Sequence, residues 1–361
     1  MEEKGKKGRM DYTLLLIVVL LVVIGLVILY STSAYNGQVK FHDSFYYLKK
    51  QAFATVLGIV LMLFVAGMDY HIWQRLAVFG YLAAVALSVA VMLFGREING
   101  SKRWLALGPF SFQPSEFAKV ALILFLADLV TKNVKTIGKM WTLCRIMFWI
   151  LPIVGLVGAS NLSTAIIILG IGVILIFVAS PKYAQFALMG IAGACFMGIF
   201  LALESYRLER LAIWRNPEKY EKGYQTLQGL YAIGSGGVFG VGIGNSVQKQ
   251  GFVPEAQNDM IFSIICEELG LAGAGIIVFL FLLLIWRFFL IASGSRDLFG
   301  ALIATGAMAH MMIQVILNIA VVTNTIPNTG ITLPFISYGG TSVMFLLIEM
   351  GLVLSVSQVV D

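Results

Sequence analysis

Residues 12–33 read YTLLLIVVLLVVIGLVILYSTS, an apolar run without a charged side chain. A bilayer core about 30 Å thick needs roughly 20 such residues in a helix, so this stretch predicts a membrane-spanning helix. We expect it to be retained and not cleaved as a signal peptide. Its apolar core is too long for one, and no small-residue cleavage site follows Tyr30.

The whole chain is apolar in composition. Of its 361 residues 59% are hydrophobic and 12% charged, and the mean hydropathy is +0.89. A soluble domain carries about 25% charged residues, so soluble, collagen-like and disordered chains are excluded. We therefore expect an all-α, polytopic integral membrane protein. The three cysteines imply no disulfide framework. The net charge of +6 comes mostly from residues that flank apolar segments, which favours anionic membrane lipids over nucleic acid as partner.

The same length criterion predicts ten membrane-spanning helices, of which the eighth is long enough to contain a bend. They cover residues 12–33, 51–68, 74–95, 115–131, 142–158, 162–180, 184–204, 259–292, 298–323 and 339–358. Three regions result from this assignment. Residues 1–11 form a basic tail, residues 12–358 form the transmembrane domain with a large extracytoplasmic loop at 205–258, and residues 359–361 end the chain on the cytoplasmic side.

Basic residues set the expected orientation. The tail before the first span carries Lys4, Lys6, Lys7 and Arg9. By the positive-inside rule this tail is cytoplasmic, and an even number of spans returns the C-terminus to the same side. The short 96–114 loop then holds Arg96, Lys102 and Arg103 outside, against the rule. Either they bind an anionic ligand or they pair with Glu97 and Glu116, and the sequence favours neither interpretation.

Two pairs of residues near this loop have different chemistry. Arg103 has a guanidinium that suits phosphate oxygens, and Trp104 suits a sugar face or, more commonly, the membrane interface. Glu116 and Lys119 are three residues apart on one helix face, so they can neutralise each other, and a structural ion pair is the favoured interpretation.

The 205–258 loop has two distinct halves. Residues 206–224 mix aromatic and charged side chains, which is typical of a segment lying on the membrane surface. The second half carries Gly234, Gly236, Gly237, Gly240, Gly242 and Gly244. Such glycines permit close approach of an anion, but neither nucleotide-binding fingerprint is met. Flexibility or tight helix packing explains them equally well.

Carboxylates follow this glycine-rich half. Asp259 lies where the polar loop changes into an apolar helix, and a carboxylate near a helix N-terminus is favoured in its ionised form. It could serve as a general base or hold a divalent cation such as Mg²⁺ or Mn²⁺. The position of Asp259 alone slightly favours a simpler role, in which it is only a negative charge at a helix N-terminus. Glu267 and Glu268 would lie two turns deeper and need water or partners.

Two uncharged features complete the candidates. His310, Gln314 and Asn318 recur every four residues and form one polar stripe on the ninth span. A proton path is conceivable, but hydrogen bonding between helices is the favoured role. The connection from Asn324 to Thr341 is rich in Pro, Gly and Thr, and is typical of irregular backbone tucked into protein at membrane depth.

Five motifs resemble a known family in its own order. They are NGSKRWL at 99–105, FQPSEFAK at 112–119, GSGG at 234–237, PEA at 254–256 leading through Asp259 to EELG at 267–270, and GITLPFISYGG at 330–340. Together they span nearly the whole chain and resemble the SEDS family of shape, elongation, division and sporulation proteins. The runs at 240–246 and 329–334 are more similar to its FtsW and SpoVE branch than to its RodA branch.

This resemblance implies a fold, an activity and a partner. Family members have ten transmembrane helices and polymerise lipid II into glycan strands at the outer face of the bacterial cytoplasmic membrane. They work with a class B penicillin-binding protein in division, elongation or spore-cortex synthesis. The implied reaction is attack of a sugar 4-hydroxyl on C1 of a second lipid II chain, with undecaprenyl pyrophosphate as leaving group. Two further classes of function remain: a lipid II flippase and a non-catalytic scaffold.

The resemblance also implies site residues. The family's catalytic Asp corresponds to Asp259, and its Arg-Trp pair to Arg103 and Trp104. We predict that substrate is bound by Lys102, Arg103, Trp104, Glu116, Lys119, Glu255 and Glu268. The chain departs from the family at Gln257-Asn258, where many relatives have His-Thr. A second departure is Ser160-Asn161-Leu-Ser163, where relatives usually have a Gln-Pro-Asp-Leu-Gly-like run.

Overall fold

The computed structural model describes residues 10–98, 101–107, 110–187, 190 and 212–359. The helices are α1 (Tyr12–Phe41), α2 (Tyr46–Gly67), α3 (His71–Phe94), α4 (Pro114–Asn133), α5 (Met140–Ser160), α6 (Leu162–Ala179), α9 (Tyr224–Ser235), α10 (Ile261–Gly294), α11 (Leu298–Val322) and α12 (Gly340–Ser357). Two short 3₁₀ turns, η1 (Pro217–Lys219) and η2 (Glu221–Gly223), precede α9. Three short strands, β1 (Arg96–Ile98), β2 (Ser101–Leu107) and β3 (Phe110–Phe112), separate α3 from α4.

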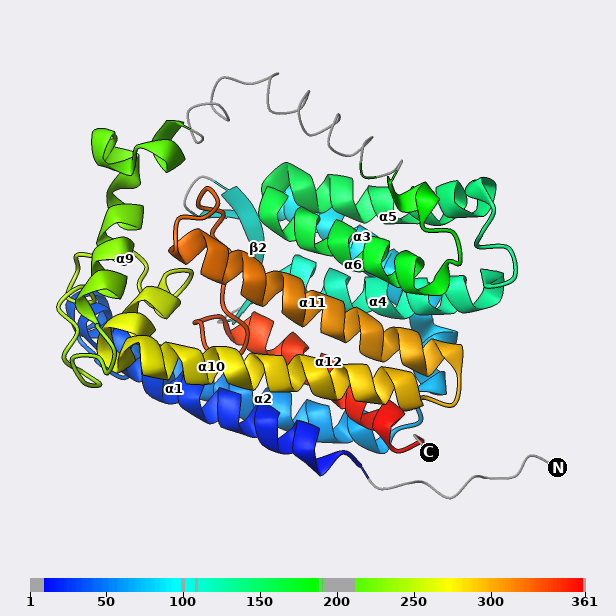
Figure 1. Ribbon diagram of the computed structural model, residues 1–361, viewed down its shortest axis with the longest axis horizontal. Helices are drawn as coiled ribbons and strands as arrows, with labels where there is room; N and C mark the ends of the chain where they lie inside the picture. The colour runs from blue at the N-terminus through cyan, green and yellow to red at the C-terminus, as the bar shows by residue number, and fades with distance from the viewer. Residues whose placement is uncertain (1–9, 99–100, 108–109, 188–189, 191–211, 360–361) are drawn as a thin grey trace.

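The long helices form two groups joined by α11 (Figure 1). In one group α1 and α12 pack against α2, and α10 packs against α1. In the other group α3 packs on α4 and α5 on α6. The central helix α11 contacts α10 and α12 on one side and α4 and α6 on the other. The architecture is thus an all-α membrane bundle, as predicted.

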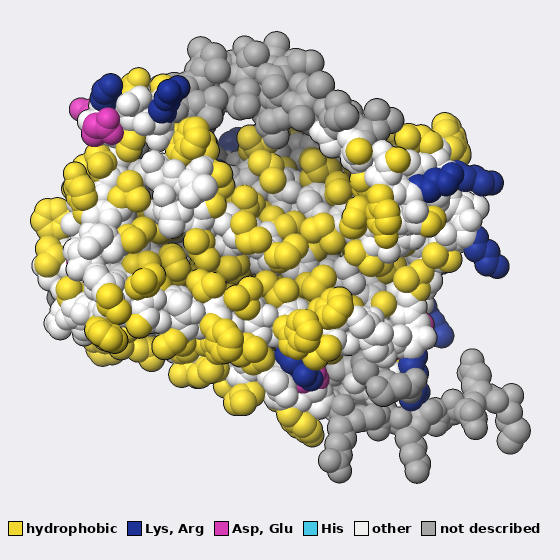
Figure 2. All heavy atoms as spheres, in the orientation of Figure 1, with side chains coloured by type: hydrophobic (Ala, Val, Ile, Leu, Met, Phe, Trp, Pro, Cys, Tyr) yellow, Lys and Arg dark blue, Asp and Glu magenta, His cyan; other side chains and the backbone are white. Residues whose placement is uncertain are grey.

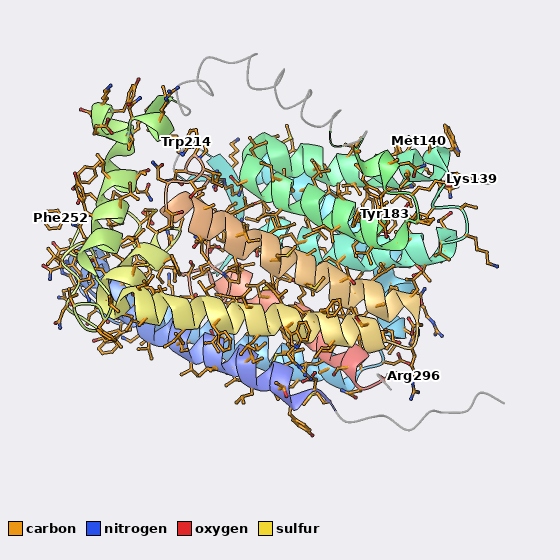
Figure 3. All side chains as sticks on the ribbon, viewed as in Figure 1. Lys139, Met140, Tyr183, Trp214, Phe252 and Arg296 are labelled. Atoms are coloured by element: carbon orange, nitrogen blue, oxygen red, sulfur yellow. The ribbon has the colours of Figure 1, made fainter. Side chains whose placement is uncertain are left out.

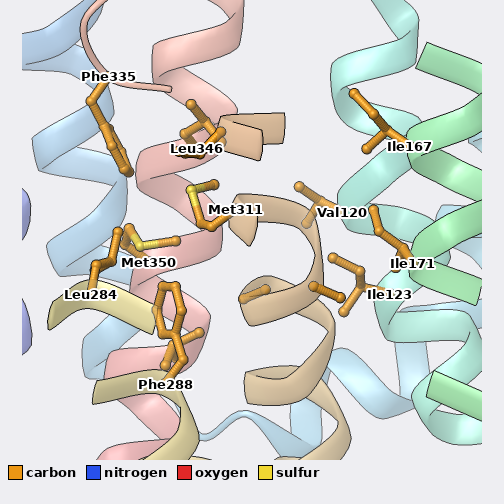
Figure 4. Packing of buried hydrophobic residues seen from close by; sticks show 14 of the residues in the cluster. Val120, Ile123, Ile167, Ile171, Leu284, Phe288, Met311, Phe335, Leu346 and Met350 are labelled. Atoms are coloured by element: carbon orange, nitrogen blue, oxygen red, sulfur yellow. The ribbon is translucent and has the colours of Figure 1, made fainter. Parts of the chain in front are cut away.

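Large apolar side chains fill the space around α11. In Figure 4 Met311 of α11 lies between Leu346 and Met350 of α12 on one side and Val120 and Ile123 of α4 on the other. All five side chains are buried. Since lipid is as apolar as these residues, close packing and buried hydrogen bonds, and not hydrophobicity alone, hold such helices together.

Within the described ranges, eight helices are long and apolar enough to cross a membrane. The predicted fourth span corresponds to α4, which has spanning length but carries buried charged side chains and is not among the eight. The predicted seventh span, residues 184–204, falls largely outside the described residues. A multi-pass membrane protein is therefore confirmed, while the count of ten stays a prediction.

The first and last described helices, α1 and α12, begin and end respectively at the same end of the bundle. The Asp11 backbone N–H donates to Ser357 Oγ at 3.1 Å, and the Asp11 carboxylate pairs with Arg287. This arrangement agrees with an even number of spans. Hydrophobic side chains cover much of the visible flank in Figure 2, and most visible Lys and Arg side chains lie toward the two ends of the bundle. Which end faces the cytoplasm stays a prediction.

The 96–114 segment differs from the loop expected there. It forms an antiparallel sheet in the order β1-β2-β3, in which Ile98 pairs with Ser101 and Leu107 with Phe110. The signal was present in the sequence, because Asn99-Gly100 between two short alternating segments is the strongest short-range hairpin pattern. This small sheet was not predicted, and it lies within a bundle that is otherwise all-α.

The predicted bend of the eighth span is at Gly270, where α10 has φ 67° and ψ −170°. Residues 236–252, which we call the glycine loop, pack against this break. Val241 N donates to Glu267 O, and Leu271 N donates to Gly237 O. A β-carbon on Gly240 would lie 2.2 Å from Glu268 O, and Gly240 itself has φ +78°. Tight packing, one of the explanations considered for the glycines, is therefore confirmed for Gly236 and Gly240, whereas nothing lies within 4 Å of the β-carbon positions of Gly234, Gly237 and Gly244.

Gly240→Ala should destabilise the protein by about 1–3 kcal/mol, because the new methyl group meets backbone and the φ angle is unfavourable for alanine. The measurement is the thermal unfolding midpoint in detergent.

Gly234→Ala is the matched control, since nothing lies within 4 Å of its β-carbon position and its backbone is helical. It should unfold at or slightly above the wild-type temperature. Equal midpoints for the two variants would contradict the packing described for the glycine loop.

Candidate active site

Asp259 lies in the turn immediately before α10 and is half-buried. Burial is the main cause that raises the pKa of its carboxyl to about 6. The nearby negative charge of Glu255 contributes to this increase, and hydrogen bonds from the backbone and Gln225 oppose it. A carboxylate with such a pKa is mostly ionised at neutral pH and can accept a proton from a substrate hydroxyl.

Three elements from distant parts of the chain surround Asp259. Gln225 of α9 donates its Nε2 to the carboxylate oxygens at 3.3 and 3.5 Å. Asn318 of α11 donates its Nδ2 to the Asp259 carbonyl at 2.9 Å and to the Ile331 carbonyl at 2.7 Å. Gly330 approaches from the third side, because its β-carbon position is 4.0 Å from Asp259 Oδ2.

Residues 323–339, the α11–α12 connection, run back into the bundle as predicted. Ile331, Leu333 and Ile336 are buried. The Phe335 carbonyl would be 2.5 Å from a β-carbon on Gly25, in the middle of α1. Its polar backbone is bonded to protein: Gln314 donates to the Thr332 carbonyl at 3.1 Å.

Two outer contacts hold the start of this connection. Ser163 of α6 donates its Oγ to the Thr329 carbonyl at 2.7 Å. Trp214 donates its Nε1 to the Asn324 carbonyl at 2.9 Å, and Figure 3 shows Trp214 beside the end of α11. The segment before α9 thus contacts the connection. Residues 206–211 of the predicted surface segment lie outside the described residues.

Arg103 lies on β2, and its Nε donates to the Ser160 carbonyl at 3.1 Å. It lines a small cavity of about 10 Å³ with Pro114 and Ser115 at the start of α4 and Asn161 at the start of α6. Two helix N-termini and a guanidinium contribute positive potential to this cavity, and the C-terminal end of α5, which also lines it, opposes them. Lys102 is exposed and Trp104 half-buried.

A series of contacts connects this cavity to Asp259. Asn161 caps α6 by accepting from Thr164 N at 3.2 Å. At the same end of α6, Ser163 donates to the Thr329 carbonyl. The next residue, Gly330, lies beside the Asp259 carboxylate. The chain's departure from the family at 160–163 therefore lies between the two predicted site groups.

Glu116 and Lys119 form the buried ion pair that their spacing predicted. Their side chains are 3.0 Å apart and almost fully buried. Ser342 of α12 donates to Glu116 at 2.9 Å, and Lys119 donates to Gln314 of α11 at 3.2 Å. This arrangement joins α4, α11 and α12 and leaves neither charge without a partner.

The polar stripe of α11 bonds neighbouring elements along its length. His310 Nδ1 lies 2.8 Å from Glu349 Oε2 of α12, and its Nε2 lies 2.8 Å from Gln314 Oε1. Gln314 and Asn318 each bond the α11–α12 connection. The predicted role in hydrogen bonding between helices is confirmed.

Glu255 and Glu268, both predicted to bind substrate, have different positions. Glu255 lies near Asp259 with φ +53° and accepts from Asn258 Nδ2 at 2.5 Å. Glu268 is buried, and Lys249 Nζ lies 2.6 Å from its Oε1 while Ser31 donates to it at 2.8 Å. Glu267, also buried, accepts from Val247 N at 3.0 Å. Glu267 and Glu268 therefore fix the glycine loop and α1 to α10.

Oxygen donors suited to Mg²⁺ near the site are the carboxylates of Asp259 and Glu255. Within the described part of the chain, no three His, Cys, Asp or Glu side chains form a metal-binding group. A metal requirement stays a prediction.

Sequence reasoning missed two features of this site. The contact of Gln225 with Asp259 had no signal in the sequence, because a single glutamine in a polar loop can bond many different partners. The partnership of Asn318 with Asp259 was also missed, since helical spacing identifies a shared face but not what packs against it.

Comparison with known proteins places these features in a wider context. The family model described as cell cycle protein, FtsW/RodA/SpoVE, matches residues 12–361. Stage V sporulation protein E of Bacillus subtilis is 40% identical over 98% of both chains. A probable peptidoglycan glycosyltransferase FtsW of Trichlorobacter lovleyi is 35% identical over 96% of this chain and 93% of its own.

Solved structures agree with these relatives. A chain from a structure on the coordination of polymerization and crosslinking by a peptidoglycan synthase complex superposes with a TM-score of 0.83. It is 30% identical, and the match covers 96% of this chain and 97% of that one. The rod shape determining protein RodA of Thermus thermophilus matches with a TM-score of 0.72 and 28% identity over 96% of both chains.

Proposed function

This chain belongs to the FtsW, RodA and SpoVE family of cell cycle proteins, and we propose that it polymerises lipid II with Asp259 as the proton acceptor. It is a peptidoglycan glycosyltransferase of the bacterial cytoplasmic membrane that acts with a penicillin-binding protein. The observation that carries the assignment of Asp259 is its position. Its half-buried carboxylate has a raised pKa and accepts from Gln225 of α9, and its backbone carbonyl accepts from Asn318 of α11.

The reaction forms one glycosidic bond and breaks one bond to phosphate oxygen. The 4-hydroxyl oxygen of one lipid II attacks C1 of the sugar chain on the other. The bond from C1 to the pyrophosphate oxygen breaks, and undecaprenyl pyrophosphate leaves with the electron pair. The hydroxyl proton passes to the Asp259 carboxylate, which must be ionised to receive it.

Arg103 is the proposed partner of the leaving group. Its guanidinium and the helix N-termini beside it offer positive potential to a pyrophosphate. Stabilising the charge that develops on the leaving group would lower the barrier. Lys102 is exposed on the same strand and can add to this potential, and Trp104 can contact a sugar face or the membrane interface.

In this proposal three of the predicted substrate-binding residues do not contact the substrate, namely Glu116, Lys119 and Glu268. Direct contact with substrate would require each buried side chain to leave its ion-pair partner, which is costly in a membrane. We therefore assign them a positioning role. Gln225 and Asn318 are positioning residues as well, because each contacts Asp259 and neither has a proton to accept or give in the reaction.

The flippase alternative depended on the His310 stripe, Glu116 and Glu267 as polar groups through the bilayer. Each of these side chains is bonded to a neighbouring helix or loop, which favours a packing role. The scaffold alternative requires Asp259 to be dispensable. The experiment on that residue tests it.

Asp259→Asn should reduce glycan strand synthesis by at least about 100-fold, the range typical of a lost general base. Purified protein with its class B penicillin-binding partner is assayed for polymerisation of lipid II. The variant should remain folded, because the amide keeps the shape of the side chain and the backbone bond to Asn318.

Asp43→Asn is the matched control, a more exposed carboxylate in the α1–α2 turn that pairs with Lys49. It should keep the wild-type rate. Strand synthesis at the wild-type rate by folded Asp259→Asn would remove Asp259 from the mechanism.

The pH dependence tests the proton-accepting role separately. Because Asp259 works ionised, the wild-type rate should fall as pH drops through about 6. Gln225→Leu removes a hydrogen bond that lowers the pKa, so the acidic limb should move to higher pH. Glu255→Gln removes a charge that raises the pKa, so the limb should move to lower pH.

Glu218→Gln, an exposed residue of η1, serves as the charge-matched control and should leave the limb in place. If Gln225→Leu and Glu255→Gln both moved the pH of the rate decrease in the same direction, Asp259 could not be the titrating group.

A further inference from the structure

The outer surface of the glycine loop is apolar. Phe239 is 83% exposed, and Val238 is 58% exposed. Three further aliphatic side chains of the loop are also exposed, namely Val241, Ile243 and Val247. Such a contiguous set of exposed apolar side chains is uncommon on a surface that faces water and marks an interaction site.

This surface also lacks charge. Residues 223–248 contain no Asp, Glu, Lys or Arg. The first charged residue that follows is Lys249, which is buried against Glu268 and Ser31 and so presents no charge outward. Binding sites for proteins usually have a polar, often charged rim. Here the glycine loop has no charge with which to specify a protein partner.

Backbone hydrogen bonds join the loop to the lipid-facing side of α10. Leu271 N donates to Gly237 O at 3.0 Å, and Ala272 N donates to Val238 O at 2.9 Å. Leu271 is 71% exposed, and the outward side of α10 continues through Ile276 and Phe279. The apolar surface of the loop is therefore continuous with that of a membrane-spanning helix.

The depth of the loop follows from the length of α10. From the Gly270 break to Gly294 the helix rises about 36 Å, slightly more than the roughly 30 Å hydrocarbon core. The break therefore lies near one boundary of that core. Aromatic side chains of the neighbouring helices mark the same end, since Tyr30 stacks on Phe45 and Phe41 on Tyr46. Such aromatic side chains are enriched at membrane interfaces.

We propose that the glycine loop is an interfacial membrane anchor that inserts Val238, Phe239, Val241 and Ile243 into the lipid leaflet on the Asp259 side. Its glycines let the backbone turn against the break in α10. The apolar side chains face outward, while the N–H groups of Val241 and Gly242 donate to α10 carbonyls and the Val238 carbonyl accepts from Ala272. The anchor would fix the height of the chain that leads to Asp259. The proposal does not depend on the role of Asp259 in catalysis.

Nitroxide labels report this insertion directly. Phe239→Cys, Val241→Cys and Ile243→Cys are each made in the full chain after replacement of Cys144, Cys195 and Cys266. Labelled protein is placed in vesicles of phosphatidylcholine and phosphatidylglycerol. Collision with apolar oxygen is compared with collision with a water-soluble nickel chelate. Phe279→Cys on exposed α10 is the lipid reference, and Lys135→Cys in the exposed connection between α4 and α5 is the water reference.

Labels at the three loop positions should favour oxygen over the chelate, as at Phe279 and opposite to Lys135. Three independent positions keep the test decisive if one variant fails to fold. Chelate accessibility equal to that at Lys135 would overturn the proposal. Labels that face water alone but become protected when a class B penicillin-binding protein is added would also overturn it, and would assign the surface to that protein.

Discussion

The buried amide of Asn318 is the interaction on which the site depends. One side chain on α11 donates to two carbonyls from segments far apart in sequence, those of Asp259 and Ile331. In a membrane an unbonded backbone carbonyl costs several kcal/mol, so irregular backbone at this depth requires a protein donor. Asn318 satisfies both segments at once and thereby sets the position of Asp259 relative to the α11–α12 connection.

Further buried polar residues form a chain of hydrogen bonds next to Asn318. One turn along α11, Gln314 bonds the same connection and accepts from Lys119. Lys119 pairs with Glu116, whose other partner is Ser342 at the start of α12. A buried charge is tolerated only when it is paired and hydrogen-bonded, so each of these residues requires the next. The result is a site whose geometry is set by the bundle, on the surface where lipid-linked sugars would arrive.

The sequence predicted the parts of this arrangement that depend on one segment alone. Span lengths followed from bilayer thickness, the bend of α10 from an excess of length, and the Glu116–Lys119 pair from helical spacing. Contacts between segments far apart in the chain could not be predicted from the sequence. Nothing in the residues themselves pairs Lys249 with Glu268 or brings Gln225 to Asp259, because a periodic pattern specifies a face and not its neighbour. The strands at 96–112 were missed although the Asn99-Gly100 turn signal was present.

The most direct test is the rate of lipid II polymerisation by Asn318→Leu, with Ile316→Leu on the exposed side of α11 as control. If Asn318 positions Asp259, the turnover number should fall at least about tenfold, equivalent to ~1.4 kcal/mol of the barrier, with little change in KM. The control should match the wild type. A folded Asn318→Leu protein with wild-type turnover would contradict the account.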